Sequence, residues 1–388
     1  MTTVGARPLQ ARPGEASFAA LKEEIEAYVR DSGERWAELI ERERRVPMEL
    51  WDELRERGYL RLAAPPEYGG QGIPLTRYLE LLELFSMSHA SLRMIVHVCN
   101  GIWRPLDSHA SQQQRERFVL PQVRGEIKVA FTLTEPTAGT GADLRSSVVR
   151  EGDTYYLTGE KHLITFGTIA DYLLLFARVQ GSKGAEGTVA LMVPPRGEGV
   201  AAGVMPETMG VRGTDHAHLV FDRAPVPVAN RLGEEGEGLE IALSGFLAPS
   251  RISVAMTCVG LARRALELAL DYANRRETFG KRIAARQAIA FKLAEMATDI
   301  EAARSLTLQA AGLWETGGDA NAQSAMAKLF ASEMLQRVTD AALQVHGGIG
   351  YWSSSPIERI YRDARAQRFE EGTAEIQKTT IARELLRR

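Results

Sequence analysis

The sequence predicts an α+β protein that is mainly α-helical and is built from three successive parts. Apolar residues recur at helical spacing near both ends of the chain, and short β-rich runs separated by Gly, Pro and Asp fill the middle. We therefore expect an N-terminal helical domain over residues 1–125, a small antiparallel β domain over 126–235 and a C-terminal four-helix bundle over 236–388.

The N-terminal part carries the pattern of several helices. Leu21, Ile25 and Val29 recur at helical spacing, and Gly58 ends one of these helices. The clearest later helices are expected over 76–86, 90–103 and 111–120. Pro121 should stop the last of them, because proline lacks the donor that a helix interior needs.

His89, Arg93 and His97 lie four residues apart and so form one polar stripe on an otherwise apolar helix. The stripe either touches solvent or faces inward. An inward cation is costly to bury unless it meets an anion. The sequence alone leaves both readings open.

The middle and C-terminal parts differ in pattern. No amphipathic helix separates the β-rich runs over 129–133, 154–157, 173–176, 189–193 and 219–221. No Gly-x-Gly-x-x-Gly follows a strand, which argues against a Rossmann dinucleotide site. Long Ala- and Leu-rich helices are expected over 238–246, 250–276, 284–316 and 320–345.

Composition excludes several classes of function. The 388 residues are 45% hydrophobic and 25% charged, as in an ordinary globular enzyme, and the net charge of −3 gives no electrostatic reason for binding nucleic acid or a membrane. Cys99 and Cys258 form neither a metal-binding pair nor a disulfide framework. No apolar run approaches the roughly 18 residues of a membrane span. Arg7 and Arg12 precede no signal-peptide core, so we expect a cytoplasmic protein. Because the two cysteines do not form a metal-binding pair, we expect no metal site.

Near the C-terminus, Glu370-Glu371-Gly372-Thr373 places two carboxylates directly before a predicted helix. Gly372 permits tight backbone geometry, and Thr373 is suited to cap the helix. The free amides of such a helix start suit an anionic or polar ligand. Taken alone, this stretch also fits a solvated acidic turn.

Five separated segments of the chain resemble signatures of the acyl-CoA dehydrogenase family of flavoproteins, in the family's order. They are Leu133-Thr134-Glu135-Pro136 with Ala138-Gly139; Met209-Gly210-Val211-Arg212; Tyr272-Ala273 with Phe279-Gly280; Gln344-Val345-His346-Gly347-Gly348; and Glu371-Gly372-Thr373. The resemblance implies a noncovalent FAD, a homotetramer of two dimers, and α,β-dehydrogenation of an acyl thioester carried by coenzyme A or an acyl-carrier protein. The implied electron acceptor is an electron-transfer flavoprotein or oxygen.

Dehydrogenation of this kind needs a base for the weakly acidic α-proton, a polarised thioester carbonyl and a hydride acceptor. Glu371 matches the family's catalytic base, and a filled acyl pocket should raise its pKa by desolvation. Some relatives carry the base on a bundle helix just before an arginine. Here that position is Ser250-Arg251, so the alternative base is absent. Glu370 replaces a frequent tyrosine and receives no assigned role.

The resemblance also assigns binding residues. Those matching positions along the flavin and pyrophosphate are Phe131, Leu133, Thr134, Gly139, Thr140 and Thr165. Those matching groups at the neighbouring subunit's FAD are Arg276, Phe279, Gln344 and Gly348, while Thr373 and Gln377 match the adenosine diphosphate end. The substrate side would include Arg251, Gly372 and Arg383.

Two departures from the family pattern affect the flavin side. The chain has Gly139-Thr140-Gly141 in place of the usual Gly-Ser-Asp, and Leu163 in place of an aromatic that shields the flavin. Phe166 is a candidate to replace part of that shield. These changes put standard docking of an electron-transfer flavoprotein in doubt. They leave an oxidase or monooxygenase as the alternative function, and a non-catalytic flavoprotein as a third.

Arg93 aligns with a pocket position that is arginine in glutaryl-CoA dehydrogenases, where it binds the distal carboxylate of the substrate. One hypothesis is therefore an acyl group with an acidic or polar far end, held by paired hydrogen bonds. The other is a short or branched apolar acyl group, with Arg93 satisfied inside the protein.

Overall fold

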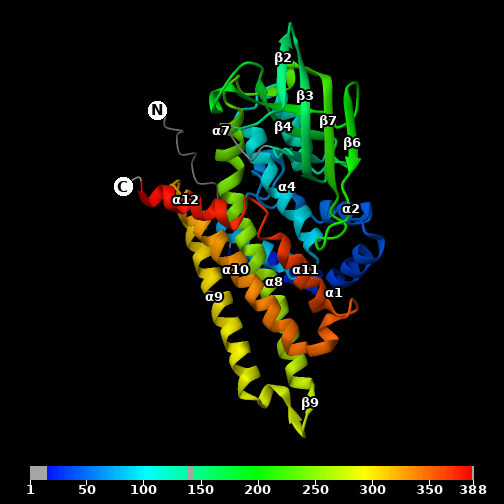
Figure 1. Cartoon of the computed structure of the whole chain (residues 1–388), viewed down its shortest axis with the longest axis vertical. Coiled ribbons are helices and arrows are strands. Elements are labelled where there is room, and N and C mark those ends of the chain that lie inside the picture. Colours follow the sequence, from blue (N-terminus) through cyan, green and yellow to red (C-terminus); the bar gives the residue numbers. More distant parts are fainter. Residues whose placement is uncertain (1–14, 138–142, 387–388) are drawn as a thin grey trace.

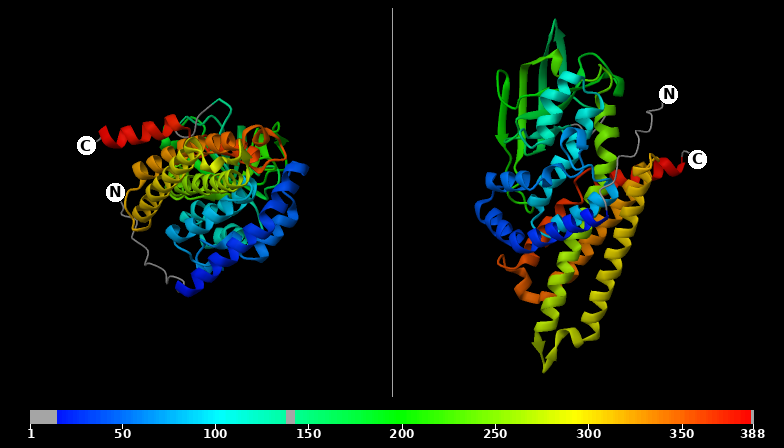
Figure 2. Two further views of the ribbon diagram at one scale, coloured as in Figure 1. Left: turned by 90° about the horizontal axis from the view of Figure 1, so that it is seen from below. Right: turned by 180° about the vertical axis from the view of Figure 1, so that it is seen from behind.

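The computed structural model describes residues 15–137 and 143–386. A β-sheet forms one end of the molecule, and the long helices α8, α9 and α10 extend from it to the other end (Figure 1). The N-terminal helices lie against the middle of the molecule (Figure 2). The mainly helical α+β architecture predicted from the sequence is confirmed.

The N-terminal helices bury their apolar faces against one another and against the bundle. Leu79, Leu82 and Phe85 on α3 are fully buried and share one core with Val259 and Ala262 on α8. The helices of this part are α1 (Glu15–Glu43), α2 (Met48–Glu56), α3 (Leu75–Ser86), α4 (Ala90–Ser108), α5 (Gln112–Gln114) and α6 (Leu120–Val123), with a π-helical turn at Arg115–Val119. This shared core fixes α4 relative to α8, the two helices that later supply site residues.

The prediction that Pro121 ends a helix is wrong. The chain continues through the π-helical turn into α6, where Pro121 lies in the first turn. Proline is tolerated there because the amide it lacks would have no helical partner of its own. Helix α4 likewise runs past Pro105 to Ser108, five residues beyond the predicted end.

The sheet is mixed, and the prediction of an antiparallel domain is wrong in this respect. Its strand order is β6-β7-β3-β2-β4-β5-β8, and β1 also pairs with β4. Both β1 and β2 run parallel to β4, at Tyr172–Leu175 and Arg178–Val179 respectively. β2 follows β1 in the sequence, and both strands pair with β4. The strands are β1 (Val129–Thr132), β2 (Ser147–Glu151), β3 (Thr154–Thr165), β4 (Tyr172–Val179), β5 (Thr188–Val193), β6 (Val200–Val204), β7 (His216–Pro227) and β8 (Arg231–Leu232).

The C-terminal part is a helical bundle. Its helices are α7 (Gly238–Ala242), α8 (Ala248–Arg275), α9 (Gln287–Glu315), α10 (Asn321–His346), α11 (Pro356–Ala366) and α12 (Ala374–Leu386), with a hairpin of β9 (Glu277–Thr278) and β10 (Lys281–Arg282) at its tip. In the described chain, Gly238–Arg275 is long and apolar enough to cross a membrane, but 83% of its most apolar window is buried inside the protein. That burial is typical of a core helix.

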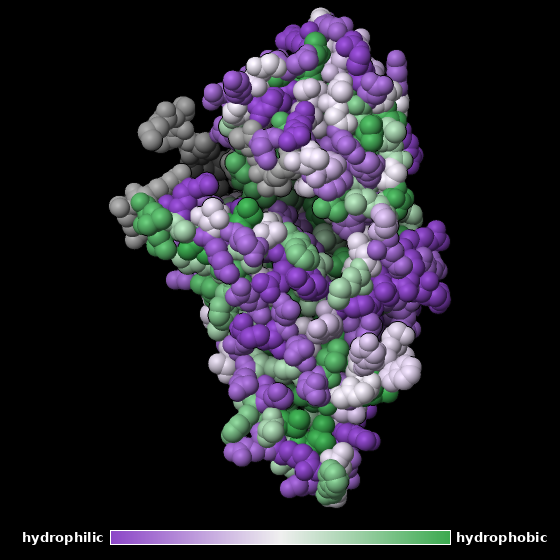
Figure 3. Space-filling view, in the orientation of Figure 1, coloured by the Kyte–Doolittle hydropathy of each residue, from purple (hydrophilic) through white to green (hydrophobic). Residues whose placement is uncertain are grey.

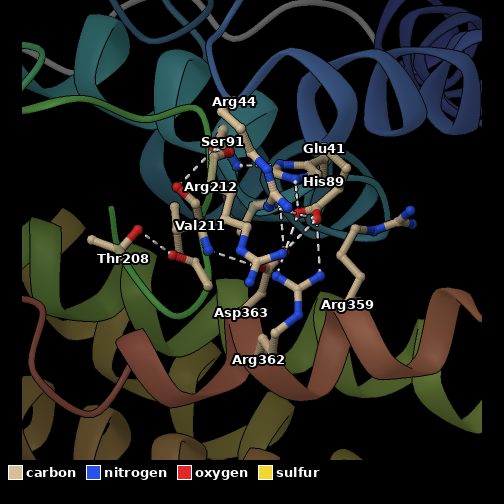
Figure 4. Close-up of polar contacts among 12 residues, drawn as sticks. Glu41, Arg44, His89, Ser91, Thr208, Val211, Arg212, Arg359, Arg362 and Asp363 are labelled. Carbon is tan, nitrogen blue, oxygen red and sulfur yellow. Dashed lines mark hydrogen bonds and ion pairs between the residues drawn. The ribbon is translucent and has the colours of Figure 1, made fainter. Parts of the chain in front are cut away.

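A polar network fastens the three parts together (Figure 4). Asp363 on α11 accepts the Val211 amide from the loop before β7 at 2.6 Å. Glu41 on α1 accepts from Arg362 on α11 at 3.0 Å and from Arg212 at 3.4 Å. The network holds α11, and hence the turn that follows it, against both the sheet and the N-terminal helices.

Candidate active site

The turn between α11 and α12 has an unusual backbone. Glu371 adopts φ +53° and Gly372 φ +96°, so two successive residues lie in the left-handed region. Lys328 on α10 donates through Nζ to the carbonyls of Arg368 at 3.1 Å and Gly372 at 2.7 Å. Gln377 Nε2 donates to the Glu371 carbonyl at 2.9 Å. These bonds hold a strained turn that points one defined carboxylate away from solvent, as is common at functional sites.

The Glu371 carboxylate meets residues from two helices. Ser250 Oγ, near the start of α8, donates to Glu371 Oε1 at 2.8 Å. His97 Nε2 on α4 lies 3.1 Å from the same Ser250 oxygen. The position that carries an alternative base in some relatives therefore holds a hydrogen-bond partner of the carboxylate.

Burial raises the pKa of Glu371 to about 7. The Ser250 hydrogen bond opposes this shift, and the negative charge of Glu370 adds to it. The cations Arg251 and Lys328 lower the pKa but do not outweigh burial. A carboxylate with a pKa near neutrality can both accept and release a proton at working pH, which is the property a general base needs.

Arg93 points inward and meets an anion supplied by the chain itself. Its side chain is fully buried, and Nη2 lies 3.2 Å from Glu370 Oε2 and 3.1 Å from Gln367 Oε1. His89 and His97 are 0% and 5% exposed, so the whole stripe on α4 is internal. The solvent-facing reading of the stripe is wrong.

A small cavity of about 10 Å³ lies beside Ser250 and His97. It is lined by Tyr78, His97, Asn100, Gly101, Arg104, Phe246, Pro249, Ser250 and Ser253. On the face seen in Figure 3, the surface is hollowed between the sheet and the helices. The cavity therefore lies on the side of Ser250 and His97.

One end of the β3–β7 strand pair lies near the turn. Thr165 at the end of β3 pairs with His216 of β7, and the charge of Glu370 acts on His216. Leu163 adopts φ +57° and is 52% exposed. Phe166 does not share that surface, because its ring is buried against Trp51 at a centroid distance of 5.1 Å. Leu163 thus stands without a neighbouring aromatic shield from Phe166.

The residues after β1 are anchored by a buried ion pair. Lys161 Nζ lies 2.9 Å from Glu135 Oε1 and donates to the Leu133 carbonyl at 2.9 Å. Glu135 also accepts the Arg145 and Ser146 amides. Burial lowers the pKa of Lys161 to about 8, while Glu135 opposes that shift. The glutamate of the Leu133–Pro136 motif therefore shapes this turn.

The remaining predicted flavin-side residues of this region have mixed surroundings. Phe131 is half-buried and stacks on Phe246 at 4.3 Å between ring centroids, and Leu133 is buried. Thr134 is partly exposed. Gly139 and Thr140 lie outside the described residues.

Profiles of three successive family domains match the chain. They are the acyl-CoA dehydrogenase N-terminal domain over residues 16–126, the middle domain over 130–224 and the C-terminal domain over 236–386. The chain belongs to the acyl-CoA dehydrogenase family. It is accordingly a flavoprotein oxidoreductase of the class that acts on CH–CH bonds.

Individual members of the acyl-CoA dehydrogenase family match over nearly the full length. The chain is 36% identical over 352 residues to an acyl-CoA dehydrogenase of Bacillus subtilis, covering 90% of this chain and 93% of that protein. Butyryl-CoA dehydrogenase from Megasphaera elsdenii superposes with a TM-score of 0.89 at 34% identity, covering 94% of this chain and 98% of that one. The prolyl acyl carrier protein oxidase AnaB superposes at 0.88 with 30% identity, covering 96% and 100%.

The residues expected at a neighbouring subunit's cofactor form a second, separate group. Arg276, Phe279, Gln344 and Gly348 are exposed, and Phe279 is 97% exposed. They lie where α8 and α10 end, far along the bundle from the sheet (Figure 1). One chain therefore does not bring them to Glu371, and they are available to another molecule.

The remaining substrate-side and cofactor-side residues surround the turn. Arg251 is buried and donates to Asn321 Oδ1 at 3.2 Å, whereas Arg383 is exposed on α12. Thr373 receives the Ile376 amide at a long 3.5 Å. Its predicted capping role is thus present but weak.

The polar atoms around the turn fit the acyl-CoA dehydrogenase cofactor. Thr214 Oγ1, His216 Nδ1 and Gln377 Oε1 are buried without hydrogen-bond partners among the described residues. Buried polar groups of this kind normally have a partner. A flavin dinucleotide has donors and acceptors along its ring and ribose. It would supply partners to residues at the end of the β3–β7 strand pair and on α12.

Sequence reasoning missed several residues that shape this site. Ser250 was noted only for not being a carboxylate, and Lys328 and Gln367 were not noted at all. Ser250 and Lys328 contact the 367–373 turn across the fold, and Gln367 lies within it and donates to Glu370. The available signal was a polar residue inside an apolar helical face, which marks Lys328 as a buried cation that needs partners.

Proposed function

We propose that the chain catalyses FAD-dependent α,β-dehydrogenation of an acyl thioester, with Glu371 as the base. The observation that carries this proposal is the Glu371 carboxylate itself. It accepts a hydrogen bond from Ser250 on a strained turn, its pKa is raised to about 7, and the charge of the adjacent Glu370 acts on His216, which pairs with Thr165 in the sheet. Each feature matches what α-proton abstraction beside a flavin requires.

In the proposed reaction the α-carbon C–H bond breaks and its proton passes to the Glu371 carboxylate. FAD, when bound, supplies the acceptor for the hydride that leaves the β-carbon, so the C–C double bond forms with balanced charge. Ser250 keeps the carboxylate oriented, and Lys328 holds the backbone of the turn in place. Burial of the carboxylate keeps the pKa of the base high.

For the substrate, the contacts favour a short acyl group without an acidic end. Arg93 already has a carboxylate partner, Glu370, and is fully buried. A second carboxylate from a substrate would have to displace that partner or share it. Turnover of butyryl-CoA and glutaryl-CoA by the wild type and Arg93→Ala tests this choice. We expect the wild type to prefer butyryl-CoA. If the wild type instead prefers glutaryl-CoA and Arg93→Ala loses that preference, the acidic-end hypothesis is restored.

The electron acceptor and the carrier form a second choice. Exposed Leu163, in place of the usual aromatic at the flavin side, favours the oxidase alternative, because Phe166 is buried against Trp51 and does not shield it. The similarity to an acyl carrier protein oxidase supports the same alternative. Hydrogen peroxide formed in air during butyryl-CoA oxidation would favour the oxidase, while reduction only of added electron-transfer flavoprotein would favour the dehydrogenase.

We further propose that the protein is a homotetramer. Only six of the 29 residues of α9 are buried within one chain. The exposed Arg276 and Phe279 group would complete a cofactor site in a partner. Light scattering of the FAD-loaded protein tests this: a mass of four chains supports it, and a monomer contradicts it.

The test of the catalytic assignment is anaerobic titration of the FAD-loaded protein with butyryl-CoA. The flavin absorbance should bleach in the wild type and in Glu375→Gln, a matched change at an exposed carboxylate four residues away. Glu371→Gln should bind FAD yet bleach at least about 1,000-fold more slowly, since a general base contributes roughly that factor. Bleaching at the wild-type rate would remove Glu371 from the mechanism.

A further inference from the structure

Glu371 ends a hydrogen-bonded series of three polar side chains from three elements of the fold. Ser250 Oγ lies 2.8 Å from Glu371 Oε1 and 3.1 Å from His97 Nε2. Ser250 and His97 are 4% and 5% exposed, and Glu371 is half-buried. Bulk water therefore does not compete for the hydrogen bond between Ser250 and His97.

The donors and acceptors available decide the direction of these two hydrogen bonds. An ionised carboxylate only accepts hydrogen bonds, and a serine hydroxyl has a single hydrogen. Ser250 must therefore donate to Glu371, which leaves its lone pairs facing His97. The histidine can satisfy them only with a hydrogen on Nε2. Its Nδ1 then carries a lone pair, and that atom is buried without a hydrogen-bond partner among the described residues.

The surroundings keep the His97 ring uncharged. Burial, with a smaller effect from the cations Arg93 and Arg104 on the same helix, lowers its pKa to about 3. From α8, the group that faces the ring is the neutral hydroxyl of Ser250. The tautomer set by Ser250 is therefore stable through the neutral pH range.

The charged groups that face Glu371 come from three elements. They are Glu370 on the same turn, Arg251 on α8 and Lys328 on α10. Within the described residues, Ser250 donates a hydrogen bond to Oε1 of the carboxylate. The two oxygens of the carboxylate are therefore not equivalent.

We propose that His97 and Ser250 are positioning residues for the base: His97, as the Nε2–H tautomer, orients the Ser250 hydroxyl so that it holds Oε1 and leaves Oε2 to take the α-proton. This inference rests on the proposed role of Glu371. When the α-C–H bond breaks, the proton forms an O–H bond on Oε2, while the hydrogen of Ser250 stays on its own oxygen. His97 and Ser250 therefore orient the base and transfer no proton.

The pH profile of anaerobic flavin reduction by butyryl-CoA tests Ser250. A hydrogen bond donated to a carboxylate stabilises its ionised form. Ser250→Ala should therefore move the acidic limb of the rate profile upward by about one pH unit. Ser250→Thr keeps a hydroxyl and should keep the wild-type limb. An unmoved limb in Ser250→Ala, even with a lowered thermal midpoint, would make Ser250 merely structural and overturn the proposal.

His97 is tested by a pair of variants and by its own spectrum. His97→Leu removes the donor and should shift the same limb upward by a smaller amount, whereas the amide N–H of His97→Gln should restore it. In ¹⁵N-histidine spectra of the FAD-loaded protein, the His97 signal should show a neutral ring with hydrogen on Nε2 from pH 5 to pH 9. A hydrogen on Nδ1, or a charged ring, would overturn the proposal.

Glu371→Gln separates this inference from the proposed function. If that variant bleaches normally, the base itself is misassigned and both proposals fail. If Glu371→Gln is inactive while Ser250→Ala keeps the wild-type pH profile, only the positioning role fails.

Discussion

The buried pair of Arg93 and Glu370 gives a stability prediction that can be worked from its geometry. The charges lie 3.2 Å apart, and at an effective dielectric of about 20 their attraction is about 5 kcal/mol. Arg93 is fully buried and the Glu370 side chain is 20% exposed, so desolvation offsets part of that attraction. Losing one partner should cost more than losing both.

Arg93→Met would leave Glu370 without its cation. The unpaired and largely buried carboxylate should cost about 3–5 kcal/mol. Glu370→Gln would leave a buried arginine that cannot release its proton, at about 3–5 kcal/mol. The double variant should cost less than the sum by about 3 kcal/mol.

The assay is urea unfolding of the wild type, both single variants and the double variant at fixed FAD concentration. The difference between the double variant and the sum of the singles is the coupling free energy. Additivity within about 0.5 kcal/mol would show that the two groups do not interact, and would refute the internal pairing of Arg93. A coupling of about 3 kcal/mol would support it.

Three further predictions concern other parts of the site. Because burial raises the pKa of folded Glu371 from the ordinary value of 4.5 to about 7, proton binding favours the folded state below pH 4.5, and this contribution is lost as pH rises through 7. Glu371→Gln should therefore unfold like the wild type at pH 4.5 but be more stable by up to about 3 kcal/mol at pH 9, and a pH-independent difference would contradict the shift. Lys161→Met should cost about 3–5 kcal/mol in urea unfolding, since it leaves buried Glu135 unpaired; an unchanged midpoint would show that the pair is not needed. Gly372→Ala should slow flavin reduction at least about tenfold, because a β-carbon at φ +96° would lie 3.0 Å from Gln377 Nε2 and displace the turn; a wild-type rate would show that the turn tolerates the strain.

Local sequence patterns predicted the helices better than the sheet. Helical periodicity located α3, α8 and α10 because each buries one continuous face against its neighbours. The parallel pairing of β1 and β2 with β4 was not predictable, because it joins strands that are distant in the sequence. The prediction that Pro121 ends a helix failed because the π-helical turn before it changes which backbone amides need partners.

In the candidate site, too, residues within a local motif were predictable and their distant partners were not. Glu371 and Gly372 were found from a short motif, and the left-handed backbone of both residues agrees with the tight turn predicted there. The partners of these residues were not, because they are distant in sequence: Ser250 lies 121 positions from Glu371, and Arg93 lies 277 positions from Glu370. The stripe on α4 showed that His89, Arg93 and His97 share a face, but only the packing of α11 and α12 shows which anion they meet.

The most direct test of the central claim follows α-proton removal without requiring hydride transfer. A 3-thia acyl-CoA carries sulfur at the β-position, so it has no β-hydrogen to lose, and only its α-hydrogens can exchange with solvent. In D₂O, the FAD-loaded wild type and Glu375→Gln should wash deuterium into the α-position, as measured by NMR. Glu371→Gln should show exchange at least about 1,000-fold slower. Wild-type exchange in Glu371→Gln would contradict the assignment of Glu371 as the base.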